Sequence, residues 1–148
     1  MQLFRFLVIS LLTISSTAFA KIKDNSFLME EAYNQEAGVV QFINGFQYTE
    51  PTNDWSYTFT NEIPIGDETH QFSYVIPVNK SGEADETAIG DVLLNYRYQL
   101  VNKEHLAMAP RLSLIVPTGD YKKGFGYGAP GLQFNHAVSI EVNEKWTN

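Results

Sequence analysis

The stretch GDVLLNYRYQLVN, Gly90 to Asn102, places an apolar residue at every second position from Val92 to Leu100. Apart from Leu93, the residues between them are polar or charged, namely Asp91, Asn95, Arg97 and Gln99. A period of two is the pattern of a β-strand, because successive side chains leave a pleated backbone on opposite faces. The stretch therefore predicts a strand with one apolar, tyrosine-rich face and one polar face.

The same alternation recurs along the chain and predicts a succession of strands. Their approximate ranges are 39–48, 55–63, 71–78, 90–102, 106–117 and 132–142, and a seventh begins near residue 145. Short connections alternate with long loops, which we expect at 79–89 and 118–130. Strands of about ten residues joined in this way are typical of outer-membrane barrels. The predicted fold is all-β, an antiparallel up-and-down transmembrane β-barrel.

Two environments remain open for the apolar faces. In a soluble barrel or sandwich they point to the core, whereas in a membrane barrel they point outward to lipid and the polar faces line the lumen. Aromatic residues gather near strand ends, as they do at membrane interfaces. Those that flank the first loop are Phe46, Tyr48, Trp55 and Tyr57. The polar faces also carry few lysines, unlike a typical solvated sheet face. We therefore expect the Tyr96 face to contact lipid and the Arg97 face to line a lumen. The alternative is a soluble periplasmic barrel or sandwich that binds an apolar ligand.

The number of strands bears on closure of this barrel. Bacterial membrane barrels have at least eight strands, and an open sheet edge in hydrocarbon leaves backbone groups without partners. Six complete strands do not reach that number. We therefore expect residues 39–148 to form a partial barrel, the N-terminal portion of a longer one.

The first twenty residues predict export. Residues 1–20 carry Arg5, then an apolar run of about nine residues, then Ala18-Phe19-Ala20, which is the pattern of a secretory signal peptide with its cleavage site. The run is too short to span a bilayer as a helix. The chain has no cysteine and a formal charge of −7, and this acidity argues against binding nucleic acid. The expected location is the outer membrane of a bacterial cell.

Four segments resemble a known family. They are EEAYNQEAGVVQ (30–41), IGDVLLNYRYQL (89–100), APRLSLIVPTGDY (109–121) and GLQFNHAVS (131–139). Together they resemble the bacterial outer-membrane, transporter-like proteins of the meta-pathway of phenol degradation. The resemblance implies an outer-membrane β-barrel that acts as a channel or transporter for small, aromatic or apolar molecules. It supplies no catalytic residues.

The polar faces supply the candidate site residues. We expect the following side chains to line the lumen: Asp91, Asn95, Arg97, Gln99, Arg111, Gln133, Asn135 and Glu141. A tight turn at 102–105 would place Arg97 and Arg111 opposite or diagonal to each other, and opposed like charges need neutralisation. One interpretation is a basic pair that selects anions or orients a solute. The other is a structural network with Asp91 and Glu141.

Residues 21–38 precede the first strand, and we expect a periplasmic lead-in or a plug folded into the lumen. The plug candidates are Glu30, Glu31, Tyr33, Gln35 and Glu36. The other interpretation is a solvated arm. The expected partners are outer-membrane lipid, a small-molecule solute and the barrel-assembly machinery.

The remaining motifs predict no enzyme, cofactor or metal site. Residues 126–131, GYGAPG, have the spacing of a dinucleotide fingerprint, but a strand follows them where that site needs a helix. His70, His105 and His136 show no metal-ligand spacing, and no nucleophile–base arrangement is visible. The glycines are better explained as turns of a long loop that carries Tyr121, Phe125 and Tyr127.

Overall fold

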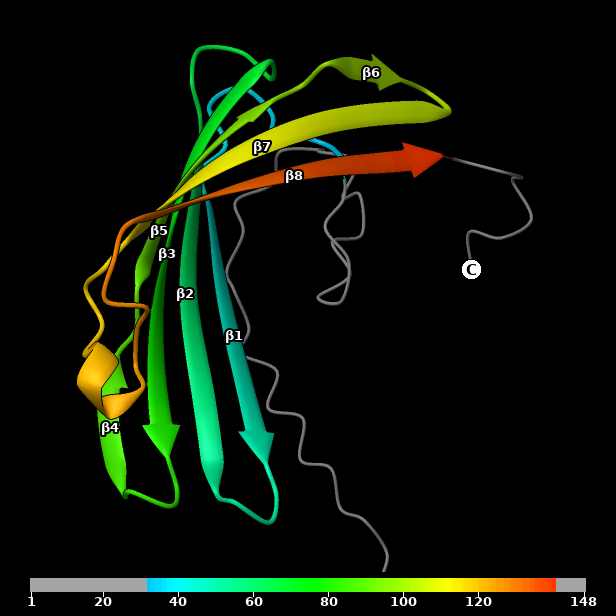
Figure 1. The fold of residues 1–148 in the computed structure, drawn as a ribbon. Helices are drawn as coiled ribbons and strands as arrows, with labels where there is room; N and C mark the ends of the chain where they lie inside the picture. The colour runs from blue at the N-terminus through cyan, green and yellow to red at the C-terminus, as the bar shows by residue number, and fades with distance from the viewer. Residues whose placement is uncertain (1–31, 141–148) are drawn as a thin grey trace, which may run out of the picture.

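The computed structural model describes residues 32–140 as one antiparallel sheet curled into a half-barrel (Figure 1). Its strands are β1 (Gln41–Thr49), β2 (Asp54–Pro64), β3 (His70–Ser81), β4 (Glu86–Ile89), β5 (Val92–Tyr98), β6 (Val101–Lys103), β7 (Leu106–Val116) and β8 (Gly131–Ile140). A single turn of 3-10 helix, η1 (Tyr121–Lys123), lies between β7 and β8. The predicted all-β antiparallel fold is confirmed. Within residues 32–140, no helix has both the length and the apolar character needed to cross a membrane.

The sheet is an up-and-down meander in which β4, β5 and β6 together take the place of one strand between β3 and β7. β1 pairs with β2, β2 with β3, β3 with β4 and β5, β5 and β6 with β7, and β7 with β8, all antiparallel. The half-barrel has two free edges within the described residues, along β1 and along β8.

β4, β5 and β6 follow one another along a single line, with one extra residue at each junction. The pairs Val75↔Leu93 and Val78↔Ile89 enclose two residues of β3 but three residues of the other strand, 90–92. Likewise, Arg97↔Arg111 and Val101↔Met108 enclose three residues against two. Such β-bulges bend a strand and increase its twist. The strand is therefore longer than the predicted 90–102, and the predicted loop 79–89 shrinks to a turn between Ser81 and Glu86.

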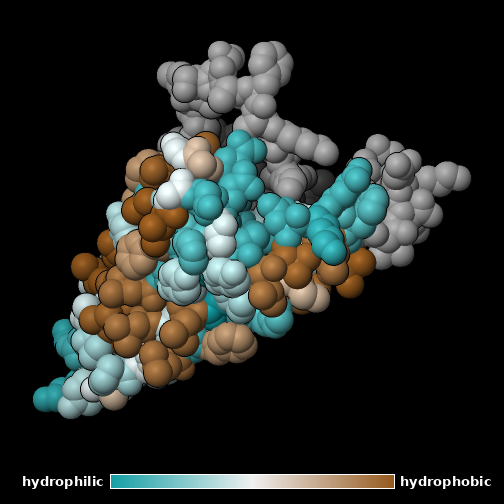
Figure 2. All heavy atoms as spheres, turned by 90° about the horizontal axis from the view of Figure 1, so that it is seen from above, coloured by the Kyte–Doolittle hydropathy of each residue, from teal (hydrophilic) through white to brown (hydrophobic). Residues whose placement is uncertain are grey.

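The two faces of the sheet differ in polarity in the sense that the alternation predicts. The large apolar side chains on the convex face are exposed, and they include Phe42, Phe46, Tyr96, Leu112, Leu114, Leu132 and Phe134. Polar side chains on the concave face are buried, and they include Gln71, Ser73, Asn95, Arg97, Gln99 and Ser113. Figure 2 shows hydrophobic residues gathered along the outer side of the curved sheet and hydrophilic residues along its inner side.

The described core is correspondingly small. Ala32, Ala107 and Ala109 are fully buried together, and Tyr33 and Ala137 pack against them. Small side chains on β7 and β8 let the N-terminal segment approach the concave face closely, because alanine adds little beyond the backbone. The fold thus buries a polar surface and exposes an apolar one, the reverse of a water-soluble sheet.

The two ends of the sheet are named here by the residues that dominate them. The Arg97 end carries the short turns 65–69 and 104–105, and the segment 32–36 lies there on the concave face. The Asp91 end carries the turns 50–53 and 82–85 and the long loop 117–130.

Candidate functional site

A row of polar side chains crosses the concave face at the Arg97 end. The sheet register places Gln71 opposite Arg97, Arg97 opposite Arg111, and Arg111 opposite Asn135. The short turn after β6 and the extra residue of the bulge at 98–100 together set this opposition of two arginines, and the predicted opposite placement is confirmed. When the Asn135 amide is oriented so that its oxygen faces a donor and its nitrogen faces acceptors, the oxygen accepts a hydrogen bond from Arg111 Nη2 at 2.7 Å.

Arg97 is 6% exposed and makes polar contacts to both sides. Its Nη2 lies 3.8 Å from Glu62 Oε1 on β2. It also donates from Nε to Asn34 Oδ1 at 2.9 Å and from Nη2 to the Tyr33 carbonyl at 3.2 Å. A buried guanidinium needs such partners because its desolvation is costly.

Glutamine side chains bind the backbone of the N-terminal segment. Gln99 accepts from Asn34 N at 2.7 Å through Oε1 and donates to the Ala32 carbonyl at 2.7 Å through Nε2. Gln71 Oε1 accepts from Gln35 N at 2.7 Å. Ser139 Oγ accepts from Ala32 N at 3.1 Å. The strands therefore bind the main chain of residues 32–35 at several points, and the side chains of Asn34 and Gln35 add further contacts, among them Gln35 Nε2 to Glu62 Oε2 at 3.1 Å.

The turn 65–69 completes this contact. Asn34 Nδ2 donates to the carbonyls of Glu68 and Thr69 at 2.9 and 3.2 Å, and Gln99 N donates to the Thr69 carbonyl at 2.8 Å. The turn is shaped by Asp67, whose Oδ1 accepts from Thr69 N at 2.8 Å. That hydrogen bond from the Thr69 backbone is the main reason why the pKa of Asp67 is lowered from 3.8.

A carboxylate organises the Asp91 end. Asp91 is 7% exposed, and its two oxygens accept from Gly119 N at 2.9 Å and from Tyr127 N at 2.7 Å. Both donors belong to the loop between β7 and β8. Thr118 Oγ1 adds a donor bond to the Gly90 carbonyl at 2.8 Å and accepts from Val92 N at 3.0 Å. The loop is thus fastened at the first bulge.

Two glycines permit this close approach. A Cβ atom on Gly119 would lie 2.1 Å from the Phe125 carbonyl oxygen, and one on Gly126 would lie 2.4 Å from Asp91 Oδ1. Gly119 and Gly126 therefore serve close packing, whereas Gly124 and Gly128 have positive φ, which suits the turns that the sequence predicts for this loop.

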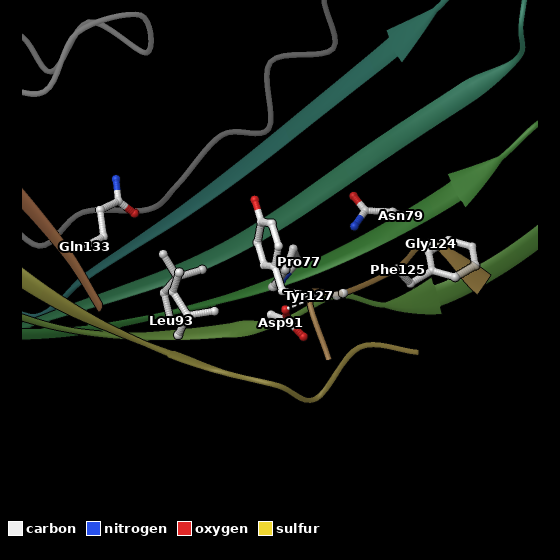
Figure 3. Close-up of a pocket in the computed structure, with 11 residues that line it drawn as sticks. Pro77, Asn79, Asp91, Leu93, Gly124, Phe125, Tyr127 and Gln133 are labelled. Carbon is white, nitrogen blue, oxygen red and sulfur yellow. Dashed lines mark hydrogen bonds between the residues drawn. The ribbon is translucent and has the colours of Figure 1, made fainter. Parts of the chain in front are cut away.

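A pocket of about 430 Å³ lies between this loop and the concave face (Figure 3). Apolar walls come from Pro77, Leu93, Ile115 and Phe125, and the polar groups come from Asn79, Asp91 and Gln133. In Figure 3, Tyr127 stands over Pro77 and Asp91 at the middle of the pocket. Phe125 is 8% exposed, whereas Tyr127 is 82% exposed.

The structure brings the predicted site residues into two groups. Arg97, Gln99, Arg111 and Asn135 lie at the Arg97 end, and Asp91 and Gln133 lie at the Asp91 end. Asn95 lies between them, opposite Ser73 and Ser113. Tyr33 and Gln35 belong to the segment on the concave face and Glu36 is exposed, while Glu30, Glu31 and Glu141 lie outside the described residues.

The structural network with Asp91 and Glu141 is wrong in its Asp91 part, and Glu141 lies outside the described residues. The oxygens of Asp91 accept backbone N–H groups of the loop, and among the described residues Glu62 is a carboxylate beside Arg97. Glu62 and Gln71 are functional candidates that the sequence reasoning left out. Their position in the alternation could have identified them, because both fall on the polar faces of their strands.

Two buried atoms between the groups lack protein partners among the described residues. They are Asn95 Oδ1 and Ser113 Oγ, on neighbouring strands. Buried polar atoms of this kind are sites for water or for polar groups of a bound molecule. Residues 32–140 contain no cluster of three or more His, Cys, Asp or Glu side chains that could hold a metal ion.

Comparison with known proteins identifies a family. No curated protein and no solved structure matches the chain. Residues 20–147 match the family model described as "Putative MetA-pathway of phenol degradation". This match covers most of the chain and agrees with the resemblance of the four sequence segments. The chain therefore belongs to the phenol-degradation MetA-pathway family.

Proposed function

We propose that the chain forms part of an outer-membrane β-barrel that acts as a channel or transporter for small, aromatic or apolar molecules. The observation that carries this proposal is the inverted polarity of the half-barrel, whose convex face exposes apolar side chains while its concave face buries polar ones. That arrangement suits lipid outside and water inside. The family's connection with phenol degradation supports an aromatic solute.

In this proposal the concave face is the lumen, and the solute passes along it by diffusion. The row from Gln71 to Asn135 and the unpartnered atoms of Asn95 and Ser113 supply polar groups along the way. Residues 32–36 plug the Arg97 end and face the periplasm. The signal peptide and the barrel-assembly machinery would deliver the chain to the membrane. The edges of β1 and β8 need partner strands there, because hydrocarbon offers no hydrogen bonds.

The rival function is a soluble periplasmic protein that binds an apolar ligand inside its sheet. Such a protein needs apolar side chains on its concave face. Leu93 and Ile115 are on that face, but most of the buried side chains there are polar. The geometry favours the channel.

A substitution on each face separates the two functions. Leu112 is 50% exposed on the convex face, so Leu112→Arg would change the stability of a soluble protein by less than about 0.5 kcal/mol. In a bilayer the same change costs about 2–4 kcal/mol near the midplane. Gln133→Arg, on the concave face of the adjacent strand, is the matched control. The measurement is urea unfolding of the protein in lipid vesicles.

Fractionation of cells that express the protein gives the second test. A channel stays with the outer membrane after osmotic shock, whereas a soluble periplasmic protein is released. Release of the protein together with an unchanged stability of Leu112→Arg would overturn the proposal.

A further inference from the structure

The pocket at the Asp91 end has features of a built binding site. Its volume of about 430 Å³ falls within the range of about 300–1,000 Å³ that small-molecule sites occupy. Its walls come from β3, β5, β7, β8 and the loop 117–130. Apolar walls with a few polar groups are the usual composition of such sites.

The loop 117–130, which forms one wall of the pocket, is held in position by several contacts. Asp91 binds its backbone at two points, Gly119 and Tyr127, eight positions apart in the sequence. Asp120 Oδ1 accepts from Lys122 N at 3.0 Å and caps η1. Lys123 Nζ lies 3.1 Å from Glu86 Oε1 on β4. These contacts hold Phe125 and Tyr127 over the strands.

The charge of the pocket decides which molecules fit. Among its lining residues only Asp91 carries a full charge, and there is no lysine or arginine. Asp91 is negative and buried, so it repels an anion in a setting where Coulomb energies are larger than in water. Each of its oxygens accepts a backbone N–H group, and these bonds offset part of its negative charge, so a cation gains less from Asp91 than from a carboxylate without partners.

The amides of Asn79 and Gln133 supply the polar contacts. Asn79 Oδ1 accepts from Ser56 Oγ at 2.8 Å, and the described residues give its Nδ2 no hydrogen-bond partner. That Nδ2 lies 3.1 Å from the position of a Cβ built on Gly90, at the edge of the pocket. An amide N–H of this kind can donate to a hydroxyl or carbonyl oxygen.

From these features we propose that the pocket binds small, uncharged molecules with a ring and one hydroxyl or carbonyl group, and that it rejects their anions. The ring packs between Leu93, Ile115 and Tyr127, and the oxygen accepts from the Asn79 amide. This inference deepens and rests on the proposed function, since it places the first solute site of the channel at its Asp91 end.

The test is a titration of the purified full chain in detergent micelles with three monosubstituted benzenes that differ in charge. Phenol is neutral, benzoate is an anion and benzylammonium is a cation at pH 7. Saturation-transfer NMR measures their binding. We expect phenol to bind at least about tenfold more tightly than either charged probe. Equal binding of benzoate would overturn the charge argument, and equal binding of benzylammonium would assign the pocket to cations instead.

Two pairs of variants locate the site. Leu93→Trp fills the pocket and should weaken phenol binding at least tenfold, whereas Leu94→Trp changes the opposite face of the same strand and should not. Tyr127→Ala removes the ring but keeps the backbone N–H that Asp91 binds, and it should also weaken binding. Tyr121→Ala, in the same loop and outside the pocket, is its control.

The outcomes separate this inference from the proposed function. If the protein resides in the outer membrane but Leu93→Trp and Tyr127→Ala bind phenol as the wild type does, the pocket is not the site. If the protein is soluble yet loses phenol binding in both variants, the pocket is the binding site and the proposed channel function is wrong.

Discussion

Each end of the concave face binds a segment that covers it, but the two ends differ in how many side chains make the contacts. At the Arg97 end, Ser139, Gln99, Gln71 and Arg97 each contribute to the hold on residues 32–35. At the Asp91 end, one carboxylate accepts both backbone contacts of the loop. The backbone nitrogens of Asn34 and Tyr127 donate to side-chain oxygens at the same N···O distance, 2.7 Å. Removing one member of the first set leaves the other contacts in place, whereas removing Asp91 takes away two contacts at once and leaves Thr118 and the Lys123–Glu86 pair to hold the loop.

The largest effect should follow Asp91→Ala. It removes two hydrogen bonds to a charged group, each worth about 1.5–3 kcal/mol, and we expect the Tyr127 amide to exchange with solvent at least about 100-fold faster. Hydrogen-exchange NMR in micelles measures the rate. The Asn34 amide should exchange at its wild-type rate. An unchanged Tyr127 rate would mean that other contacts hold the loop.

Gly119→Ala should come next. Its Cβ would lie 2.1 Å from the Phe125 carbonyl oxygen, so the backbone must shift and one contact to Asp91 is lost. We expect exchange of the Tyr127 amide to accelerate about tenfold or more. Gly124→Ala is the control, because its Cβ meets nothing within 4 Å and only its φ of +81° is unfavourable. Similar rates in the two variants would contradict the packing role of Gly119.

Gln99→Ala should have a smaller effect at the other end. It removes the acceptor of the Asn34 amide and the donor to Ala32, two neutral bonds worth about 0.5–1.5 kcal/mol each. The Asn34 amide should exchange about tenfold faster. The Gln35 amide should change less, because Gln71 still accepts from it. If both amides reached the rate of an unstructured peptide, the hold would depend on Gln99 alone.

The sequence predicts the polarity of each face well and the covering contacts poorly. Alternation along 90–102 identifies the face of Tyr96 and the face of Arg97, because a one-residue shift would reverse every side chain. Nothing in that pattern shows that Gln99 binds a backbone 65 residues away. Glutamine side chains carry no information about partners that come from distant segments. The same holds for Asp91, whose partners follow it by 28 and 36 residues.

The bulges were missed for a different reason. An extra residue between 97 and 101 leaves the sequence pattern of the neighbouring stretches intact and only changes their register. Sequence alternation alone does not report register between strands. The predicted boundaries of the loop 79–89 were wrong because β3 and β4 extend the hairpin beyond the residues that alternate clearly.

The smallest predicted effect is the acid response of the turn 65–69. The folded pKa of Asp67 is lowered from 3.8, so its contribution to stability is present above the unfolded pKa. That contribution is lost as the pH falls through the lower folded pKa. The difference in urea midpoint between wild type and Asp67→Ala should be constant above about pH 5 and shrink below pH 3.8. A difference that grew on acidification would have the wrong sign.

The second bulge also has a consequence for the gene. Between Arg97 and Val101 the strand holds one residue more than β7 does, so the concave residues are odd-numbered before the bulge and even-numbered after it, as Asn102↔Ala107 shows. A three-nucleotide deletion of Leu100 would restore regular pairing without turning either flank over. The same deletion at Asn95 would reverse one flank. At a bulge, this coding sequence can therefore lose one codon without exchanging the concave and convex side chains of the flanking strands.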